Sequence, residues 1–169
     1  MNKNWYALRI KPHKEHAVSQ RLQDWDIQTY LPLVRVNPKN PRAAKHKPYF
    51  PGYLFIYTDL ENIGTNTINW LPGSIGLVSF GAIPATVPEN LILELQQRLA
   101  QIEAEGGLIF ADLEHGDKVR IVEGPFAGYE AIFDMRLPGK DRIQILLSFL
   151  SQHPQPVEMD VESIQKIKT

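Results

Sequence analysis

The sequence contains no cysteine, and this absence excludes several kinds of chemistry. Without thiols the chain forms no disulfide, offers no thiolate ligand to a metal and has no cysteine nucleophile. It also lacks any apolar run approaching the ~20 residues that a membrane helix needs. Its first residues, MNKNW, lack the apolar core of a signal peptide. Together these absences predict a soluble protein of the cytoplasm.

Recognisable catalytic motifs are absent as well. The five histidines are scattered, and the chain contains no HExxH zinc motif, no GxSxG nucleophile turn and no phosphate-binding P-loop. We therefore predict a binding protein with no enzymatic activity, no metal and no cofactor. A metal- or nucleotide-dependent enzyme is the alternative, and a thermal-shift screen for stabilising ligands would reveal it.

Acidic residues are scarce in the first third of the chain. Residues 1–53 hold ten Lys and Arg against three Asp and Glu, a net charge of +7, whereas residues 54–169 hold eight against sixteen, a net of −8. This division indicates that the first third faces an anionic partner such as nucleic acid. The alternative is a solvated basic surface that balances the acidic remainder. The phosphate contacts we expect are Lys11, Lys14 and Arg21. An exposed loop at 37–47 adds Lys39, Arg42, Lys45 and Lys47, and we expect it to be the tip of a hairpin between the strands at 27–36 and 53–57.

The chain of 169 residues is long enough for one ordinary domain or two small ones. Hydrophobic periodicity predicts strands at 5–10, 27–36, 53–57 and 75–80, and amphipathic helices at 14–25 and 88–104. Pro32 should interrupt the second of these strands, and Pro51-Gly52 should form the turn before the third. This order is typical of an α/β sandwich. Further along, short extended segments and turns recur at roughly ten-residue intervals, with strands expected at 118–122 and 129–135, which favours a small five-stranded β-barrel. The predicted class is therefore α+β.

The stretch PYFPGYLFIY carries five aromatic residues in ten positions. Strand alternation places Tyr53, Phe55 and Tyr57 on one face, with Leu54 and Ile56 on the other. We expect the aliphatic face to join the core. The aromatic face is either buried within the domain or a docking surface, because aromatic residues are enriched at interfaces.

Three motifs resemble the N-terminal domain of the NusG family of transcription elongation factors. They are Trp5-Tyr6 followed by Lys11, the segment FPGYLF, and Pro72-Gly73 followed by VSFG. The segment GDKVRIVEGPFAG is similar to the KOW motif that opens the family's C-terminal barrel. The resemblance implies an NGN-like domain, with an antiparallel sheet flanked by helices, over 1–102. A flexible linker at 103–113 and an SH3-like KOW domain at 114–169 would follow.

The resemblance implies a function through RNA polymerase. The family's N-terminal domain binds the clamp helices of the largest subunit and favours processive elongation. Its clamp-contacting positions map onto Tyr53, Phe55, Ile92 and Leu95. The exposed phenylalanine of the KOW loop maps onto Phe126, where it would meet a small-subunit ribosomal protein or a termination factor; the alternative is a core residue. We expect a monomer with no membrane partner.

Within the family, the chain most resembles the specialised RfaH-like antitermination factors, which act at particular operons. The segments TIN, FGAIPATVP and EAIF carry this likeness. The RfaH-like contact with the gate loop of the second-largest polymerase subunit maps onto Thr65 and Asn66, with the usual histidine missing. Contact with non-template DNA maps onto Lys11, but Pro72 stands where those factors have an arginine. A general NusG-type factor and a KOW-type RNA- or ribosome-binding module are the alternatives.

RfaH-like C-terminal domains also adopt a helical hairpin that masks the polymerase site. Several prolines in the C-terminal region oppose this, since proline inside a helix costs about 3 kcal/mol. We therefore predict the barrel, although the pattern of residues 142–152 is also compatible with a helix.

Overall fold

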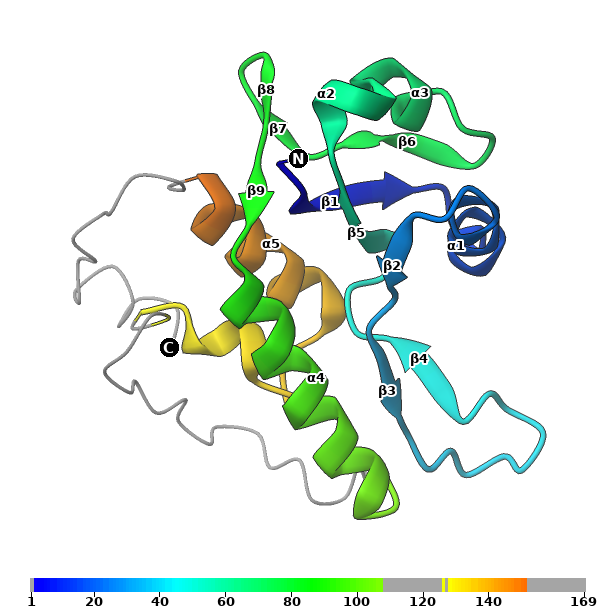
Figure 1. Cartoon of the computed structure of the whole chain (residues 1–169). Helices are drawn as coiled ribbons and strands as arrows, with labels where there is room; N and C mark the ends of the chain where they lie inside the picture. Colours follow the sequence, from blue (N-terminus) through cyan, green and yellow to red (C-terminus); the bar gives the residue numbers. More distant parts are fainter. Residues whose placement is uncertain (1, 108–125, 127, 152–169) are drawn as a thin grey trace.

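The computed structural model describes residues 2–107, 126 and 128–151 (Figure 1). Its elements are β1 (Asn4–Ile10), α1 (Glu15–Asp24), β2 (Gln28–Tyr30), β3 (Leu33–Arg35), β4 (His46–Pro48), β5 (Tyr53–Thr58), α2 (Leu60–Ile63), α3 (Thr65–Asn69), β6 (Ser74–Leu77), β7 (Ser79–Phe80), β8 (Ile83–Pro84), β9 (Thr86–Val87), α4 (Glu89–Ala104), the 3-10 helix η2 (Glu130–Phe133) and α5 (Gly139–Ser151). The described part is a mixed α and β structure.

An antiparallel sheet with strand order β2-β5-β1-β6 forms the centre of the fold. The alternating, β-prone sequence of β1 pairs with β5 in a register that sets Ala7 opposite Phe55 and Leu8 opposite Leu54. The second edge of β1 is shared: β6 pairs with its C-terminal half and β9 with its N-terminal half. The sequence did not predict β9, which is only two residues long.

The two faces of the sheet bury different side chains, as the alternation in β5 predicted. Leu54 and Ile56 belong to an aliphatic cluster with residues of α1 and α3; we call this side the aliphatic face. Phe55 belongs to a second cluster, which includes residues of α4, η2 and α5; we call this side the aromatic face. Tyr53 and Tyr57 pack at the margin of that second cluster.

Several local predictions are confirmed. Helices α1 and α4 lie where the apolar periodicity placed them. Pro32 interrupts the second extended segment, which forms β2 and β3 instead of one strand. The basic stretch after β3 is the loop of a hairpin, as expected, although its second strand is β4 and not β5. Figure 1 shows this β3–β4 hairpin projecting from the body of the molecule.

The predicted barrel strands are wrong for the residues that the structure describes. Residues 129–135 were expected to form a strand, but Glu130–Phe133 is a 3-10 helix. Residues 139–151 form α5, the helix that the sequence pattern allowed as an alternative. Pro138 precedes the first turn of α5, so the helix has no interior proline to break it. Most of the KOW-like segment lies outside the described residues.

Candidate functional site

The aromatic face brings together all the residues predicted to contact the polymerase clamp. Phe55 comes from β5, while Ile92 and Leu95 come from one stripe of α4, where residues three apart lie side by side. These three side chains are almost completely buried in a single cluster, and Tyr53 packs half-buried at its margin. They do not form the open groove that a partner helix would enter.

The cover over this face comes from the C-terminal part of the chain. Phe133 of η2 and Ile145 and Phe149 of α5 belong to the same buried cluster as Phe55. Phe126 joins them, its ring centroid lying 5.1 Å from that of Phe133 and 5.7 Å from that of Phe149. The expectation that Phe126 is exposed is therefore wrong for this structure, because these rings enclose it and leave 7% of the residue accessible.

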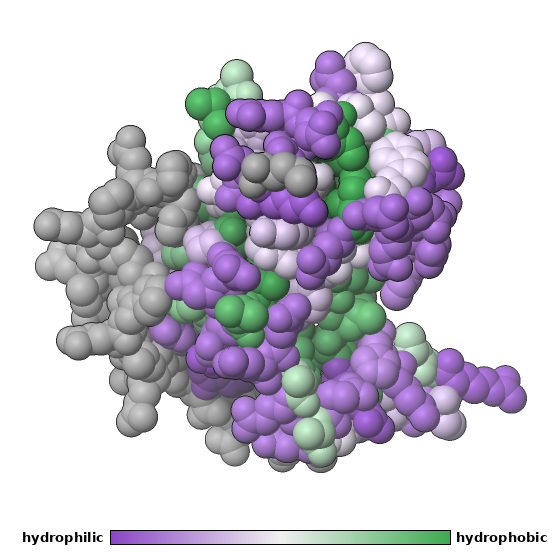
Figure 2. Space-filling model, in the orientation of Figure 1, coloured by the Kyte–Doolittle hydropathy of each residue, from purple (hydrophilic) through white to green (hydrophobic). Residues whose placement is uncertain are grey.

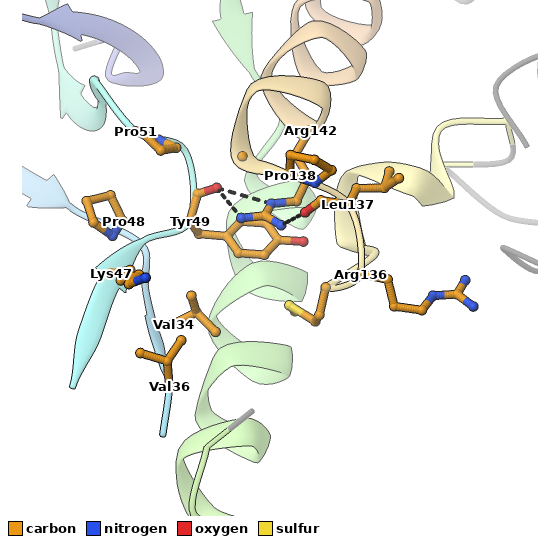
Figure 3. A pocket seen from close by; sticks show the side chains of 12 residues that line it. Val34, Val36, Lys47, Pro48, Tyr49, Pro51, Arg136, Leu137, Pro138 and Arg142 are labelled. Atoms are coloured by element: carbon orange, nitrogen blue, oxygen red, sulfur yellow. Dashed lines mark hydrogen bonds between the residues drawn. The ribbon is translucent and has the colours of Figure 1, made fainter. Parts of the chain in front are cut away.

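Tyr49 joins the two parts of the chain through both its side chain and its backbone. Its hydroxyl donates a 2.6 Å hydrogen bond to the carbonyl oxygen of Ile132 in η2. Its own carbonyl oxygen accepts hydrogen bonds from Nε and Nη2 of Arg142 in α5, at 3.1 and 2.9 Å. The Arg142 guanidinium also lies 4.0 Å above the centre of the Tyr49 ring and donates to the carbonyl of Leu137 (Figure 3).

A second polar joint lies on α4. Arg98 binds Glu94 within the helix at 2.7 Å and reaches Glu130 of η2 at 3.6 Å. The same guanidinium lies 4.9 Å from the centre of the Phe133 ring. Arg98 thus contacts both an acidic and an aromatic group of the cover, although its half-exposed position limits the strength of the ion pairs.

Burial changes the acidity of the groups in this joint. Loss of solvent raises the pKa of Glu130, and the charge of Arg98 offsets part of that effect. Burial also raises the pKa of Asp134, which a hydrogen bond from the backbone of Arg136 partly offsets. For Arg142, burial lowers the pKa, because its charge is held among neutral carbonyl groups.

The start of α5 approaches the N-terminal part of the chain closely. A Cβ atom added at Gly139 would lie 2.7 Å from Cδ of Pro51, closer than non-bonded carbon atoms normally approach. Pro51 begins the Pro-Gly turn that leads into β5, and Gly52 adopts φ of 81°, which suits glycine. Glycine at position 139 therefore lets the helix sit against this turn.

The predicted phosphate contacts lie on the opposite side of the sheet. Lys11 and Lys14 are exposed on the loop before α1, and Arg21 is exposed two helical turns after Lys14, on the same side of α1. This loop is held against the Pro72-Gly73 turn by a hydrogen bond from Lys11 N to Gly73 O. Because α1 covers the aliphatic face, these cations lie on the side of the sheet away from the aromatic face. The two surfaces would therefore contact different partners, or different parts of one partner.

A further basic surface follows the β3–β4 hairpin. Its loop carries Lys39, Arg42 and Lys45, all exposed. Figure 2 shows a hydrophilic projection at the place where Figure 1 has this hairpin. The base of the hairpin is tied to α4, since Glu103 contacts His46 at 3.0 Å and Arg35 at 3.6 Å.

The predicted gate-loop residues lie in α3. Thr65 is half-buried at the start of this short helix, and Asn66 is exposed. Trp70, directly after the helix, has 80% of its surface accessible, although no motif in the sequence marks it. Trp70 lies one helical turn after Asn66, so it sits beside the predicted gate-loop residues.

The described residues hold neither a cluster of metal ligands nor a membrane-spanning helix. Within residues 2–107, 126 and 128–151, no three His, Asp or Glu side chains come close enough together to hold a metal ion. Over the same residues, no helix is both long and apolar enough to cross a membrane.

Sequence reasoning missed Tyr49 and Arg142. Tyr49 was counted only as part of an aromatic stretch, and Arg142 only as the start of an apolar segment. A cation before an apolar run with helical spacing is only a weak signal for a buried arginine. Charged residues are rarely buried without a partner, so such a cation is normally expected at the surface. The partner here is a backbone carbonyl, which no residue pattern reveals.

Comparison with known proteins gives a family match over most of the N-terminal part. The family model described as "Transcription termination factor nusG" matches residues 3–96. Proteins named "Transcription termination/antitermination protein NusG" match nearly end to end. The one from Thermus thermophilus is 27% identical, covering 98% of this chain and 100% of its own. The one from Helicobacter pylori strain J99 is 24% identical, covering 97% and 98%.

A relative from Deinococcus radiodurans with the same name is 27% identical, and the match covers 98% of this chain and 100% of its own. Among solved structures, one titled "Domain interaction in Thermotoga maritima NusG" matches with a TM-score of 0.45 and 23% identity, over 75% of this chain and 76% of that one.

Proposed function

The chain belongs to the NusG family of transcription termination and antitermination factors, and from this membership we propose that its aromatic face binds the clamp helices of the RNA polymerase largest subunit. Tyr53, Phe55, Ile92 and Leu95 would make this contact, since they form one continuous apolar surface when uncovered. The bound factor would increase the processivity of polymerase.

The observation that carries the proposal is the burial of this surface under η2 and α5. Phe55 and Leu95 have no accessible surface in the described arrangement. Polymerase binding through them therefore requires η2 and α5 to move away first. A factor whose binding surface is covered engages polymerase only where something favours release. This favours a specialised, RfaH-like antitermination factor acting at particular operons over a general elongation factor.

The remaining contacts follow from the same assignment. Lys11, Lys14 and Arg21 would bind non-template DNA in the cytoplasm, where the factor acts as a monomer. Thr65 and Asn66 would face the gate loop of the second-largest subunit. Phe126 would become available to a small-subunit ribosomal protein or a termination factor only after it leaves its cluster with Phe133 and Phe149.

The test uses the Gly139→Ala variant of the full chain and capture of purified RNA polymerase. The added methyl group meets Pro51 at 2.7 Å, a clash of the kind that costs about 1–3 kcal/mol. We expect the cover to loosen and the apparent affinity for polymerase to rise, by up to roughly tenfold for 1.4 kcal/mol. Lys140→Ala, on the exposed next residue, is the matched control and should leave capture unchanged.

A double variant, Tyr53→Ala with Phe55→Ala, identifies the contacting surface. In the Gly139→Ala background it should abolish capture, and retained capture and antitermination would instead favour a KOW-type RNA- or ribosome-binding module.

Genome-wide occupancy separates the two remaining alternatives. Occupancy at a few operons is expected, whereas uniform occupancy would indicate the general NusG-type elongation factor.

A further inference from the structure

A cavity of about 440 Å³ lies where the β3–β4 hairpin meets the segment that leads into α5 (Figure 3). Val34, Val36 and Pro48 line it from the hairpin side, and Met135, Leu137 and Pro138 line it from the C-terminal side. Its size falls within the range of about 300–1,000 Å³ that is typical of small-molecule sites. Because each wall comes from a different part of the chain, the cavity exists only while η2 and α5 cover the aromatic face.

The polar lining of this cavity is cationic. Among the described residues that line it, Lys47, Arg136 and Arg142 are charged, and none is an Asp or Glu. Arg136 is paired with Asp134, at 2.9 Å. Arg142 is 7% exposed, and its hydrogen bonds go to the neutral carbonyl oxygens of Tyr49 and Leu137.

Arg142 therefore carries a buried charge with no carboxylate paired to it among the described residues. Asp134 and Asp141 lie near enough to influence its pKa, but neither forms an ion pair with it. A guanidinium has five N–H groups, and the three hydrogen bonds of Arg142 leave two of them unused. The Tyr49 ring lies against this guanidinium, but no anion in the described part of the chain does, so an anion placed beside it would gain more than one beside an exposed lysine.

We propose that this cavity binds a small organic anion with an apolar body. The anionic group would lie near Arg142 and Lys47, and the apolar body would contact Val34, Val36 and Leu137. Such a ligand touches both walls at once, so it stabilises the covered arrangement and opposes its release. The effect on polymerase rests on the proposed function, whereas binding to the cavity does not.

The binding test uses decanoate as the probe and decanol as its uncharged match, with the full chain in isothermal titration calorimetry. We expect saturable binding of one decanoate, and at ten times its Kd a rise in Tm of roughly 3–5 °C. Decanol should bind at least about tenfold more weakly, because it cannot pair with the arginine. No saturable binding of decanoate, or equal affinity for decanol, would overturn the proposal.

Variants locate the binding. Val36→Phe fills the cavity from the hairpin side, and Leu137→Phe fills it from the opposite wall. Each variant should abolish binding of decanoate. If Val36→Phe fails to fold, Leu137→Phe still provides the test. Leu93→Phe, on the exposed side of α4, is the control for Leu137→Phe, because it makes the same change in side-chain size outside the cavity. Lys47→Gln should weaken binding roughly fivefold, while Lys39→Gln, on the same hairpin but outside the cavity, should not. Binding retained in both filled variants would refute the site.

Polymerase capture then separates the two proposals. Decanoate should reduce capture by the unaltered chain and leave capture by Leu137→Phe unchanged. If decanoate binds as expected but capture does not change, the cavity stands and the covering mechanism of the proposed function is wrong. If decanoate does not bind, the cavity proposal fails whatever polymerase capture shows.

Discussion

The two faces of the central sheet differ in how the chain covers them. On the aliphatic face, Leu54 and Ile56 pack against α1 and α3, which follow closely on strands of the same sheet. On the aromatic face, the outer cover comes from η2 and α5. Its hydrogen bonds to Tyr49 span 83 and 93 residues of sequence. Bringing distant residues together costs more chain entropy than closing a short connection, so the second cover is the one the chain releases more readily.

The chemistry of the two faces supports the same distinction. The aliphatic cluster contains one aromatic residue, Tyr6, whereas the aromatic face contains several rings in edge-to-face or stacked pairs, including Phe50 with Phe55 and Tyr30 with Phe55. Aromatic surfaces serve both as core and as interface. An aliphatic face is thus suited to permanent burial and an aromatic one to exchange between two partners.

The largest expected effect is obtained by truncating one core residue on each face. Leu54→Ala, in the permanent core, should lower the free energy of unfolding of the N-terminal fold by about 2–5 kcal/mol. Phe149→Ala should release α5, for a cost of about 3–5 kcal/mol, and leave the sheet intact. Hydrogen exchange of β1 and β5 amides distinguishes the two results. Equal loss of protection in both variants would mean that the faces form one cooperative unit.

A smaller effect is expected from Tyr49→Phe. The variant keeps the ring but removes the donor to Ile132, leaving a buried carbonyl unsatisfied, at a cost of about 1–3 kcal/mol. We expect faster exchange of η2 and α5 amides and stronger polymerase capture. Tyr6→Phe, the matched change on the aliphatic face, should alter neither. An unchanged exchange rate in Tyr49→Phe would show that this hydrogen bond does not hold the cover.

The smallest effect is a dependence of the cover on pH. Burial raises the pKa values of Glu130 and Asp134 above their ordinary values of 4.5 and 3.8. The covered arrangement therefore binds protons more tightly than the released one. Its stability rises as pH falls through the raised pKa values, reaches its full extent below the ordinary values, and is lost as pH rises again. The protection of α5 amides, measured relative to their intrinsic exchange rates at each pH, should increase on acidification.

Glu130→Gln tests the origin of this effect. The variant places an uncharged group beside Arg98 and should remove part of the pH dependence while leaving the fold unchanged. Glu61→Gln, an exposed change on α2, is the control. A pH profile that is identical in Glu130→Gln and in the unaltered chain would assign the dependence to other groups.

Local patterns in the sequence predicted much of the N-terminal part. The alternation in β5 predicted which residues face each side, and the apolar stripe of α4 placed Ile92 and Leu95 together. Pro32 and Gly52 marked the break and the turn that the structure contains. These features depend on backbone geometry and on contacts between near neighbours, which residue order largely determines.

The C-terminal part could not be predicted in the same way. Short apolar runs such as residues 129–135 fit a strand and a helix equally well by periodicity. Which one forms depends on the surface that buries the run. In this structure the aromatic face accepts Phe133 and Phe149 from helical segments. Tertiary packing, and not local preference, selected the helices.

The sequence by itself determined the two-faced sheet, its flanking helices and the family to which the chain belongs. Only the tertiary structure decided that the predicted clamp-binding residues are covered, that Phe126 is buried, and that Tyr49 and Arg142 join the two parts. The physical reason is that burial and hydrogen bonding to a backbone carbonyl depend on segments far apart in the chain. A residue pattern records which side chains are available, and the fold decides which of them meet.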